Sequence, residues 1–161
     1  PRAVEQGEPS FAHAGAAALP EVHGDGLTSR TVFGPGAPIA HPSRPVLEDV
    51  ALVPGARLAV TREDEPRGVF VVAGSVTVDG ADHGADRLLV LPRGARVEVT
   101  AARDARVLVL GGPELDGPRH IDWNFVSSSR DVLERAKEDW RAGRFPRVLG
   151  DDGAPIPYPT R

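Results

Sequence analysis

Apolar and polar residues alternate along much of this chain, and the alternation is clearest between residues 55 and 94. Within that stretch Val69 and Val71 share one parity, and residues 75–78 alternate polar and apolar before the turn Asp79-Gly80. A period of two, with turn residues at each corner, is typical of short antiparallel strands that bury one face. We therefore expect four strands here, joined by turns.

Strand-like segments also flank this stretch. The pattern predicts further strands at residues 27–33, 46–53, 96–100 and 106–110. The last of these, RVLVL, is solidly apolar, which favours a central strand buried on both faces. About eight short strands separated by turns predict an all-β fold, either an antiparallel sandwich or a barrel.

After the last predicted barrel strand the pattern changes. Residues 120–126 form an apolar, aromatic segment that we expect to be a strand. Apolar residues then recur at helical spacing, which predicts a helix over about 129–142. Ser128 with Asp131 forms a loose capping box at its start, and Gly143 is a natural stop at its end.

The predicted organisation has three parts. Residues 1–26 are rich in Ala, Gly, Pro and Glu and should form a connector between barrels, residues 27–118 the barrel, and residues 119–161 the C-terminal strand, helix and extended tail. The chain has no methionine, even at position 1. We therefore expect a piece of a longer protein rather than a processed product.

Composition excludes several classes of function. The 161 residues include no cysteine, which excludes disulfides, thiol catalysis and thiolate metal sites. A net charge of -4 does not favour binding to the negatively charged phosphates of nucleic acid. No apolar run approaches the roughly 20 residues that span a bilayer, and no signal-peptide pattern opens the chain. We expect a cytoplasmic protein without nucleic-acid or membrane partners.

The spacing of the alternating stretch resembles the first motif of the cupin barrels: glycine, five residues, His-x-His, three or four residues, glutamate, six residues, glycine. Gly55 and Gly74 stand at its two ends in matching register. The positions of the metal ligands, however, hold Thr61, Glu63, Arg67 and, in the second cupin motif, Val97. The resemblance implies a cupin-type barrel without its usual ligands.

The C-terminal segment resembles the second half of the pirin family, proteins built from two cupin barrels in tandem. The resemblance depends on a Gly-Gly-Pro stop, the Trp-Asn-Phe-Val-Ser-Ser-Ser step into the helix, and the helix end at residues 139–145. Glu8-Pro9-Ser10-Phe11 is similar to the linker between the two barrels. The implied fold is an antiparallel, jelly-roll-like cupin β-barrel with one C-terminal α-helix.

In pirins the metal, usually iron, sits in the first barrel; some members oxidise flavonols such as quercetin and others are regulatory partners. The resemblance therefore implies no catalytic residue, metal ligand or cofactor in this chain, and iron only in the N-terminal barrel that it lacks. The chain would be a metal-free module that packs against that barrel. The intact protein would be an iron-dependent, quercetin-type dioxygenase or a redox-linked regulator, with a small aromatic ligand as a further partner.

Two sets of residues are candidates for sites in this chain. Thr61, Glu63 and Arg67 are pocket candidates, and they support the alternative of a self-contained, non-catalytic cupin that binds a small molecule. They could equally form an exposed ion pair contributing about 0–1 kcal/mol, or fill the vacated metal pocket. Trp123 and Phe125 are candidates for the interface with the first barrel, since they share one strand face; burial in a core of their own is the alternative.

Overall fold

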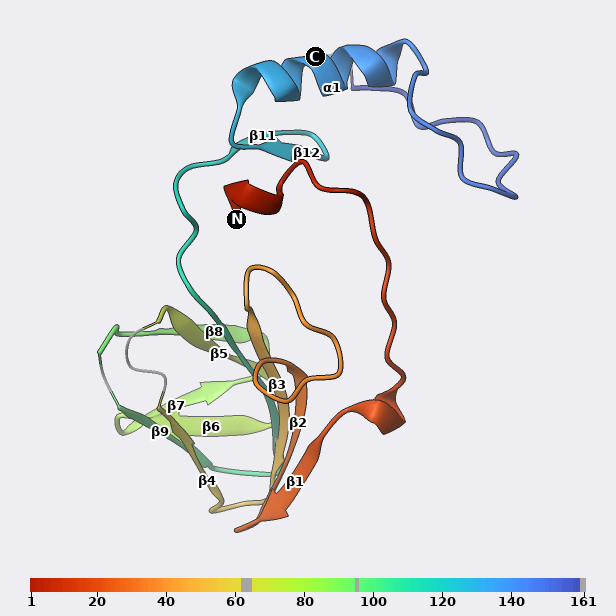
Figure 1. Cartoon of the computed structure of the whole chain (residues 1–161). Helices are drawn as coiled ribbons and strands as arrows, with labels where there is room; N and C mark the ends of the chain where they lie inside the picture. The colour runs from red at the N-terminus through yellow and green to blue at the C-terminus, as the bar shows by residue number, and fades with distance from the viewer. Residues whose placement is uncertain (62–64, 95, 160–161) are drawn as a thin grey trace. The chain divides into compact units, whose positions relative to one another are not determined.

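A computed structural model describes residues 1–61, 65–94 and 96–159 of the chain. The chain forms two compact units (Figure 1). The barrel unit consists of Glu8–Glu114, and the C-terminal unit consists of Pro1–Gly7 together with Leu115–Arg161. The site described below lies in the barrel unit.

The elements of both units are mostly short strands. The strands are β1 (Glu21–Gly24), β2 (Leu27–Phe33), β3 (Val46–Leu52), β4 (Arg57–Val60), β5 (Arg67–Ala73), β6 (Ser75–Val78), β7 (Ala81–Gly84), β8 (Arg87–Leu91), β9 (Val97–Ala101), β10 (Ala105–Gly111), β11 (His120–Asp122) and β12 (Phe125–Ser127). The helices are the 3-10 turns η1 (Arg2–Val4) and η2 (Ala16–Ala18) and the α-helix α1 (Arg130–Arg141).

Two antiparallel sheets make up the barrel unit. One has the order β1-β2-β3-β10-β5-β8 and the other the order β4-β9-β6-β7. Their inward-facing residues form one hydrophobic cluster, whose fully buried members are Val50, Val69, Val71, Val76, Val99 and Val107. The predicted all-β, antiparallel fold with one C-terminal α-helix is therefore confirmed across the described residues.

Strand β10 differs from its prediction in one respect. It is central, because it pairs with β3 on one side and β5 on the other. Val107 and Val109 are buried, but Leu108 and Leu110 are only half-buried. The expectation of burial on both faces was therefore wrong: the core covers one face of this sheet, and alternation places the two leucines on the other.

One corner of the barrel requires glycine. Gly74 joins β5 to β6 with φ at 75°, in the left-handed region that L side chains rarely adopt. A Cβ atom at this position would lie 1.9 Å from the backbone oxygen of Asp104. The second glycine of the cupin-like spacing is therefore needed both for its backbone conformation and for the close approach of the neighbouring chain.

The C-terminal unit contains a hairpin where a single strand was expected. β11 and β12 pair antiparallel, with Asp122 opposite Phe125 and a two-residue turn between them. Trp123 lies in this turn with φ at 53°, an uncommon conformation for a bulky residue. Its ring packs edge-on against three other rings of an aromatic cluster, which consists of Trp123, Phe125, Trp140, Phe145 and Tyr158. These contacts hold the turn that the sequence pattern did not predict.

Helix α1 is capped at both ends. The Ser129 hydroxyl accepts a hydrogen bond from the backbone N–H of Val132, so the N-cap lies one residue after the predicted Ser128. At the other end Gly143 has φ at 67°, and the N–H of Arg144 donates to the carbonyl of Asp139, as in a Schellman motif. In the described part of the chain, no helix has the length and apolar character to cross a membrane.

The N-terminal segment is part of the C-terminal unit through Glu5. Its carboxylate accepts hydrogen bonds from the Ser127 hydroxyl at 2.7 Å and the Ser128 backbone N–H at 2.6 Å. Arg119 lies 3.6 Å away and adds a favourable charge. These hydrogen bonds, with the smaller effect of Arg119, lower the pKa of Glu5 from 4.5 to about 2.

Candidate functional site in the barrel

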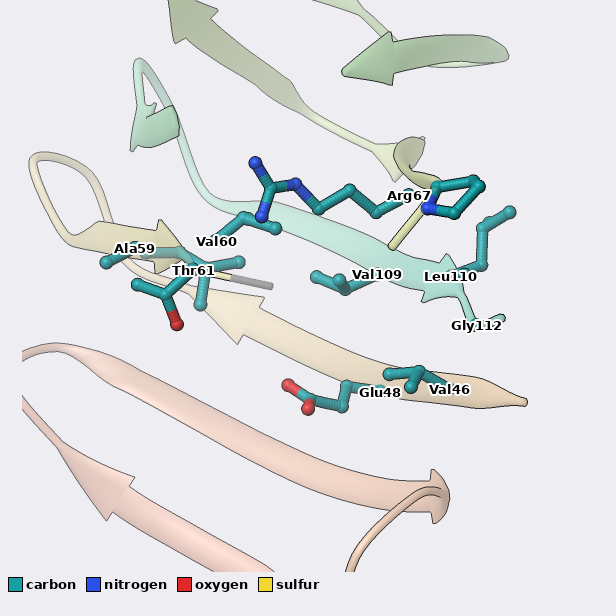
Figure 2. A pocket seen from close by; sticks show the side chains of 12 residues that line it. Val46, Glu48, Ala59, Val60, Thr61, Arg67, Val109, Leu110 and Gly112 are labelled. Atoms are coloured by element: carbon teal, nitrogen blue, oxygen red, sulfur yellow. The ribbon is translucent and has the colours of Figure 1, made fainter. Parts of the chain in front are cut away.

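A cavity of about 80 Å³ opens inside the barrel between the two sheets (Figure 2). Its walls come from β3, β4, β5 and β10 and the segments that follow or precede them. The lining residues are Val46, Glu48, Leu58, Ala59, Val60, Thr61, Pro66, Arg67, Val109, Leu110, Gly111 and Gly112. Most of the lining is aliphatic, so its few polar side chains decide what the cavity can bind.

Arg67 is the buried polar residue of this cavity. It is the first residue of β5 and shares the parity of Val69 and Val71, both fully buried, so its side chain turns inward. The residue is only 6% exposed, and its Nε and Nη1 atoms are shielded from solvent. Figure 2 shows the side chain extending from β5 across the cavity towards the end of β4. A permanent positive charge therefore lies inside the barrel.

A glycine allows the backbone to close around this arginine. Gly111 of β10 pairs directly with Arg67 of β5. A Cβ atom at Gly111 would lie 2.4 Å from the carbonyl oxygen of Pro66 and 3.2 Å from the Cβ of Arg67. Only a residue without a side chain fits between these groups. The end of β10 is thus shaped to leave Arg67 room at the cavity wall.

Glu48 supplies a carboxylate to the same cavity. It shares the parity of the buried residues Val46 and Val50 on β3, and it is half-buried. Val109 of β10 pairs with Glu48 on one side and with Val69 of β5 on the other. Glu48 and Arg67 therefore point into the barrel from strands on either side of β10.

The structure brings two of the three predicted pocket residues together. Thr61 and Arg67 both line the cavity, Thr61 as an exposed residue at the end of β4. Glu63 lies outside the described residues. Glu48 was missed, although the alternation of Val46, Glu48 and Val50 within one predicted strand could have identified it as inward-facing.

The described residues that line the cavity do not fit a bound iron ion. Val97 is 4% exposed and belongs to the hydrophobic core, and the guanidinium of Arg67 is a cation that has no electron pair to donate to a metal ion. The five histidines all lie outside the cavity lining. Among the described residues, no group of three or more His, Cys, Asp or Glu side chains is arranged to hold a metal.

The predicted interface residues lie in the C-terminal unit. Trp123 and Phe125 are half-buried, with ring centroids 5.9 Å apart, and both contact Trp140 of helix α1. On the opposite face of the same hairpin, the paired residues Ile121 and Val126 are 72% and 56% exposed. The hairpin therefore contributes aromatic rings to its own unit and an apolar pair to the surface.

Comparison with known proteins gives a consistent family assignment. Residues 47–146 match the family model described as the pirin C-terminal cupin domain. A pirin-like protein of Caulobacter vibrioides is 38% identical over 165 residues, which cover 99% of this chain and 57% of that protein. A solved structure of quercetin 2,3-dioxygenase from Acinetobacter baumannii superposes with a TM-score of 0.78 and 26% identity, covering 89% of this chain and 50% of the other.

A second structure of quercetin 2,3-dioxygenase from Acinetobacter baumannii gives a TM-score of 0.76 at 22% identity. It covers 84% of this chain and 50% of that chain. The chain thus spans only about half the length of these relatives. The cupin character of the barrel is confirmed by these superpositions.

Proposed function

Because this chain belongs to the pirin family through its C-terminal cupin domain, we propose that it is the metal-free half of a two-barrel protein and supports a metal-binding barrel that precedes it. The observation that supports the proposal is the buried guanidinium of Arg67 in the cavity. By its resemblance to the first cupin motif, this sequence has Arg67 where metal-binding cupins have a glutamate ligand. A cation in this position repels a second cation. In this proposal the preceding barrel binds the metal, and the barrel of this chain supports it.

The activity of the intact protein is the second part of the proposal. Relatives that include quercetin 2,3-dioxygenases are about twice as long as this chain. We assign to the intact protein an iron-dependent oxidation of a flavonol or another small aromatic substrate, or a redox-linked regulatory role. Both would depend on iron in the preceding barrel. A cytoplasmic location is part of the same proposal.

For the surface that faces the preceding barrel, we propose the hairpin β11–β12. Trp123 and Phe125 form the aromatic side of the hairpin, and the exposed pair Ile121 and Val126 forms its apolar outer side. Exposed apolar residues gathered on one element are typical of protein interfaces. A partner barrel that covers them would remove from water the most exposed apolar pair of this segment.

The test compares this chain alone with a longer protein in which a pirin N-terminal barrel precedes it. Iron per chain is measured by elemental analysis, and dioxygen uptake is followed with quercetin as substrate. We expect one iron and substrate-dependent uptake in the longer protein, and neither in the chain alone. Stoichiometric iron on the chain alone would contradict the proposal.

The same two samples test the interface. Both tryptophans of the chain, Trp123 and Trp140, belong to the aromatic cluster, so acrylamide quenching of their fluorescence reports on this region. We expect quenching to be weaker in the longer protein, because the partner barrel covers the hairpin. Equal quenching in both samples would place the interface elsewhere.

A second candidate function is the binding of a small molecule in the cavity itself. The observation that favours it is the combination of a buried arginine and a half-buried glutamate in an otherwise aliphatic cavity. At about 80 Å³ the cavity is well below the roughly 300–1,000 Å³ of sites for drug-sized ligands. A flavonol therefore does not fit in it, and its ligand must be much smaller.

A further inference from the structure

We propose that the barrel cavity binds a small hydroxycarboxylic acid, with its carboxylate held by Arg67 and its hydroxyl group by Glu48. The proposal rests on the second candidate function and is independent of the support role. It names the chemical class of ligand that the cavity selects. The charge, burial and placement of these two residues support the proposal, together with the volume of the cavity.

Arg67 places a buried positive charge at the cavity. Burying a guanidinium away from water is costly unless anions or hydrogen-bond acceptors offset the loss of hydration. A guanidinium has five N–H donors in a planar fork, so Arg67 can keep contacts within the protein and still present two parallel donors to a carboxylate. The aliphatic surroundings, which include Val60 and Val109, strengthen that attraction by excluding water. This end of the cavity therefore selects a carboxylate.

Glu48 adds a carboxylate to the lining of the cavity. An ionised carboxylate only accepts hydrogen bonds, so it favours a ligand with a hydroxyl donor. It lies on β3, across β10 from Arg67 on β5, and Figure 2 shows both side chains at the same cavity. A ligand with an acceptor at one end and a donor at the other matches this pair. The negative charge of Glu48 also disfavours dianions such as sulfate.

The volume of the cavity limits the size of its ligand. One water molecule needs roughly 10–15 Å³ of cavity volume, so a cavity of about 80 Å³ holds a ligand of about five to eight non-hydrogen atoms. Glycolate has five such atoms and lactate has six. The exposed Thr61 at the end of β4 lies at the cavity and adds a hydroxyl at its rim. The structure thus points to glycolate- or lactate-sized acids.

The test titrates the full 161-residue chain with four matched probes. Glycolate has both groups, acetate lacks the hydroxyl, glycolamide lacks the charge, and sulfate is a dianion. Binding is measured by calorimetry and by the NMR signal of the Arg67 Nε–H group. We expect glycolate to bind with a dissociation constant of roughly 10 µM to 1 mM, as suits so small a ligand, and to shift the Arg67 signal. Acetate should bind about tenfold more weakly, and glycolamide and sulfate not measurably.

Two variants assign the roles, and a third is the control. Arg67→Gln should weaken glycolate binding at least about tenfold. Glu48→Met should abolish the preference for glycolate over acetate while strengthening acetate binding, because the repulsive charge is gone. Arg106→Gln removes an exposed arginine on β10 that lies outside the cavity lining, and it should leave all four affinities unchanged.

The outcomes separate the proposal from nonspecific anion binding. If Arg67→Gln does not fold, the Arg67 NMR signal and the Glu48→Met variant decide the question. Equal affinities for glycolate, glycolamide and sulfate would overturn the proposal, as would binding that does not perturb the Arg67 signal. The iron measurements on the longer protein are unaffected by either result, so failure of this inference is distinguishable from failure of the support role.

Discussion

In the barrel unit, valines from two sheets pack into one continuous core, whereas in the C-terminal unit Leu133 is the one buried hydrophobic side chain among the described residues. The C-terminal unit instead has edge-to-face aromatic contacts, and its carboxyls Glu5 and Asp116 have pKa values lowered more strongly than those of Glu21 and Asp49 in the barrel unit. Apolar burial does not depend on pH, but hydrogen bonds to a carboxylate do. The C-terminal unit should therefore lose more stability than the barrel unit when the pH falls.

The largest expected effect tests how tightly the barrel unit is constrained. Gly74→Ala places a methyl group against the backbone oxygen of Asp104 and forces a non-glycine residue to φ near 75°. We expect it to lower the free energy of unfolding by about 4 kcal/mol or more, measured by urea denaturation followed by far-UV circular dichroism.

The matched control for this substitution is Gly80→Ala. Gly80 also has a positive φ, at 77°, but a Cβ atom there would meet nothing within 4 Å. Only the backbone strain remains, which costs about 1–2 kcal/mol. Similar losses in the free energy of unfolding for the two variants would show that the close approach at Gly74 is unimportant. The barrel backbone would then be able to move away from the added methyl group.

The next effect tests whether the two units unfold separately. Both tryptophans lie in the C-terminal unit, so their fluorescence follows that unit alone. Leu133→Ala should destabilise it by about 2–3 kcal/mol and shift the fluorescence transition. Val107→Ala, in the barrel core, should shift the circular dichroism transition instead. If each variant shifts both transitions equally, the two units unfold as one.

The smallest effect sharpens the contrast in pH dependence. The pKa of Glu5 is lowered from 4.5 to about 2, and that of Asp116 from 3.8 to about 2, mainly by hydrogen bonds including one from Arg119 to Asp116. A folded-state pKa below the ordinary value means that stability is fully present above that ordinary value and is lost as pH falls towards 2. The urea concentration at the unfolding midpoint, measured by tryptophan fluorescence, should therefore decrease as the pH is lowered from 5 to about 2.

The control for the pH experiment is Glu5→Gln. The amide side chain can still accept the hydrogen bond from Ser127, but it does not titrate in this range. The acid-dependent loss should become smaller in this variant, with the remainder due to Asp116 and other carboxylates. An unchanged pH profile would show that the N-terminal segment contributes little to the C-terminal unit.

Local patterns were sufficient to predict much of the barrel. Alternation along residues 75–78 indicated Val76 and Val78 as the buried side, and the cupin-like spacing placed Gly55 and Gly74 at corners where both have positive φ. The hairpin of the C-terminal unit was not predictable in the same way. Its turn contains Trp123, a residue with no turn preference, and the conformation depends on contacts with rings as distant in sequence as Tyr158.

The order of residues along the chain was enough to predict the class of fold and the family. Only the tertiary structure decided that Arg67 is buried in a cavity and that Glu48 lines the same cavity from another strand. The physical reason is that the face on which a strand residue lies follows from its neighbours in sequence, whereas the residues that it meets follow from strand pairing. Here that pairing places β10, more than thirty residues further along the chain, between β3 and β5.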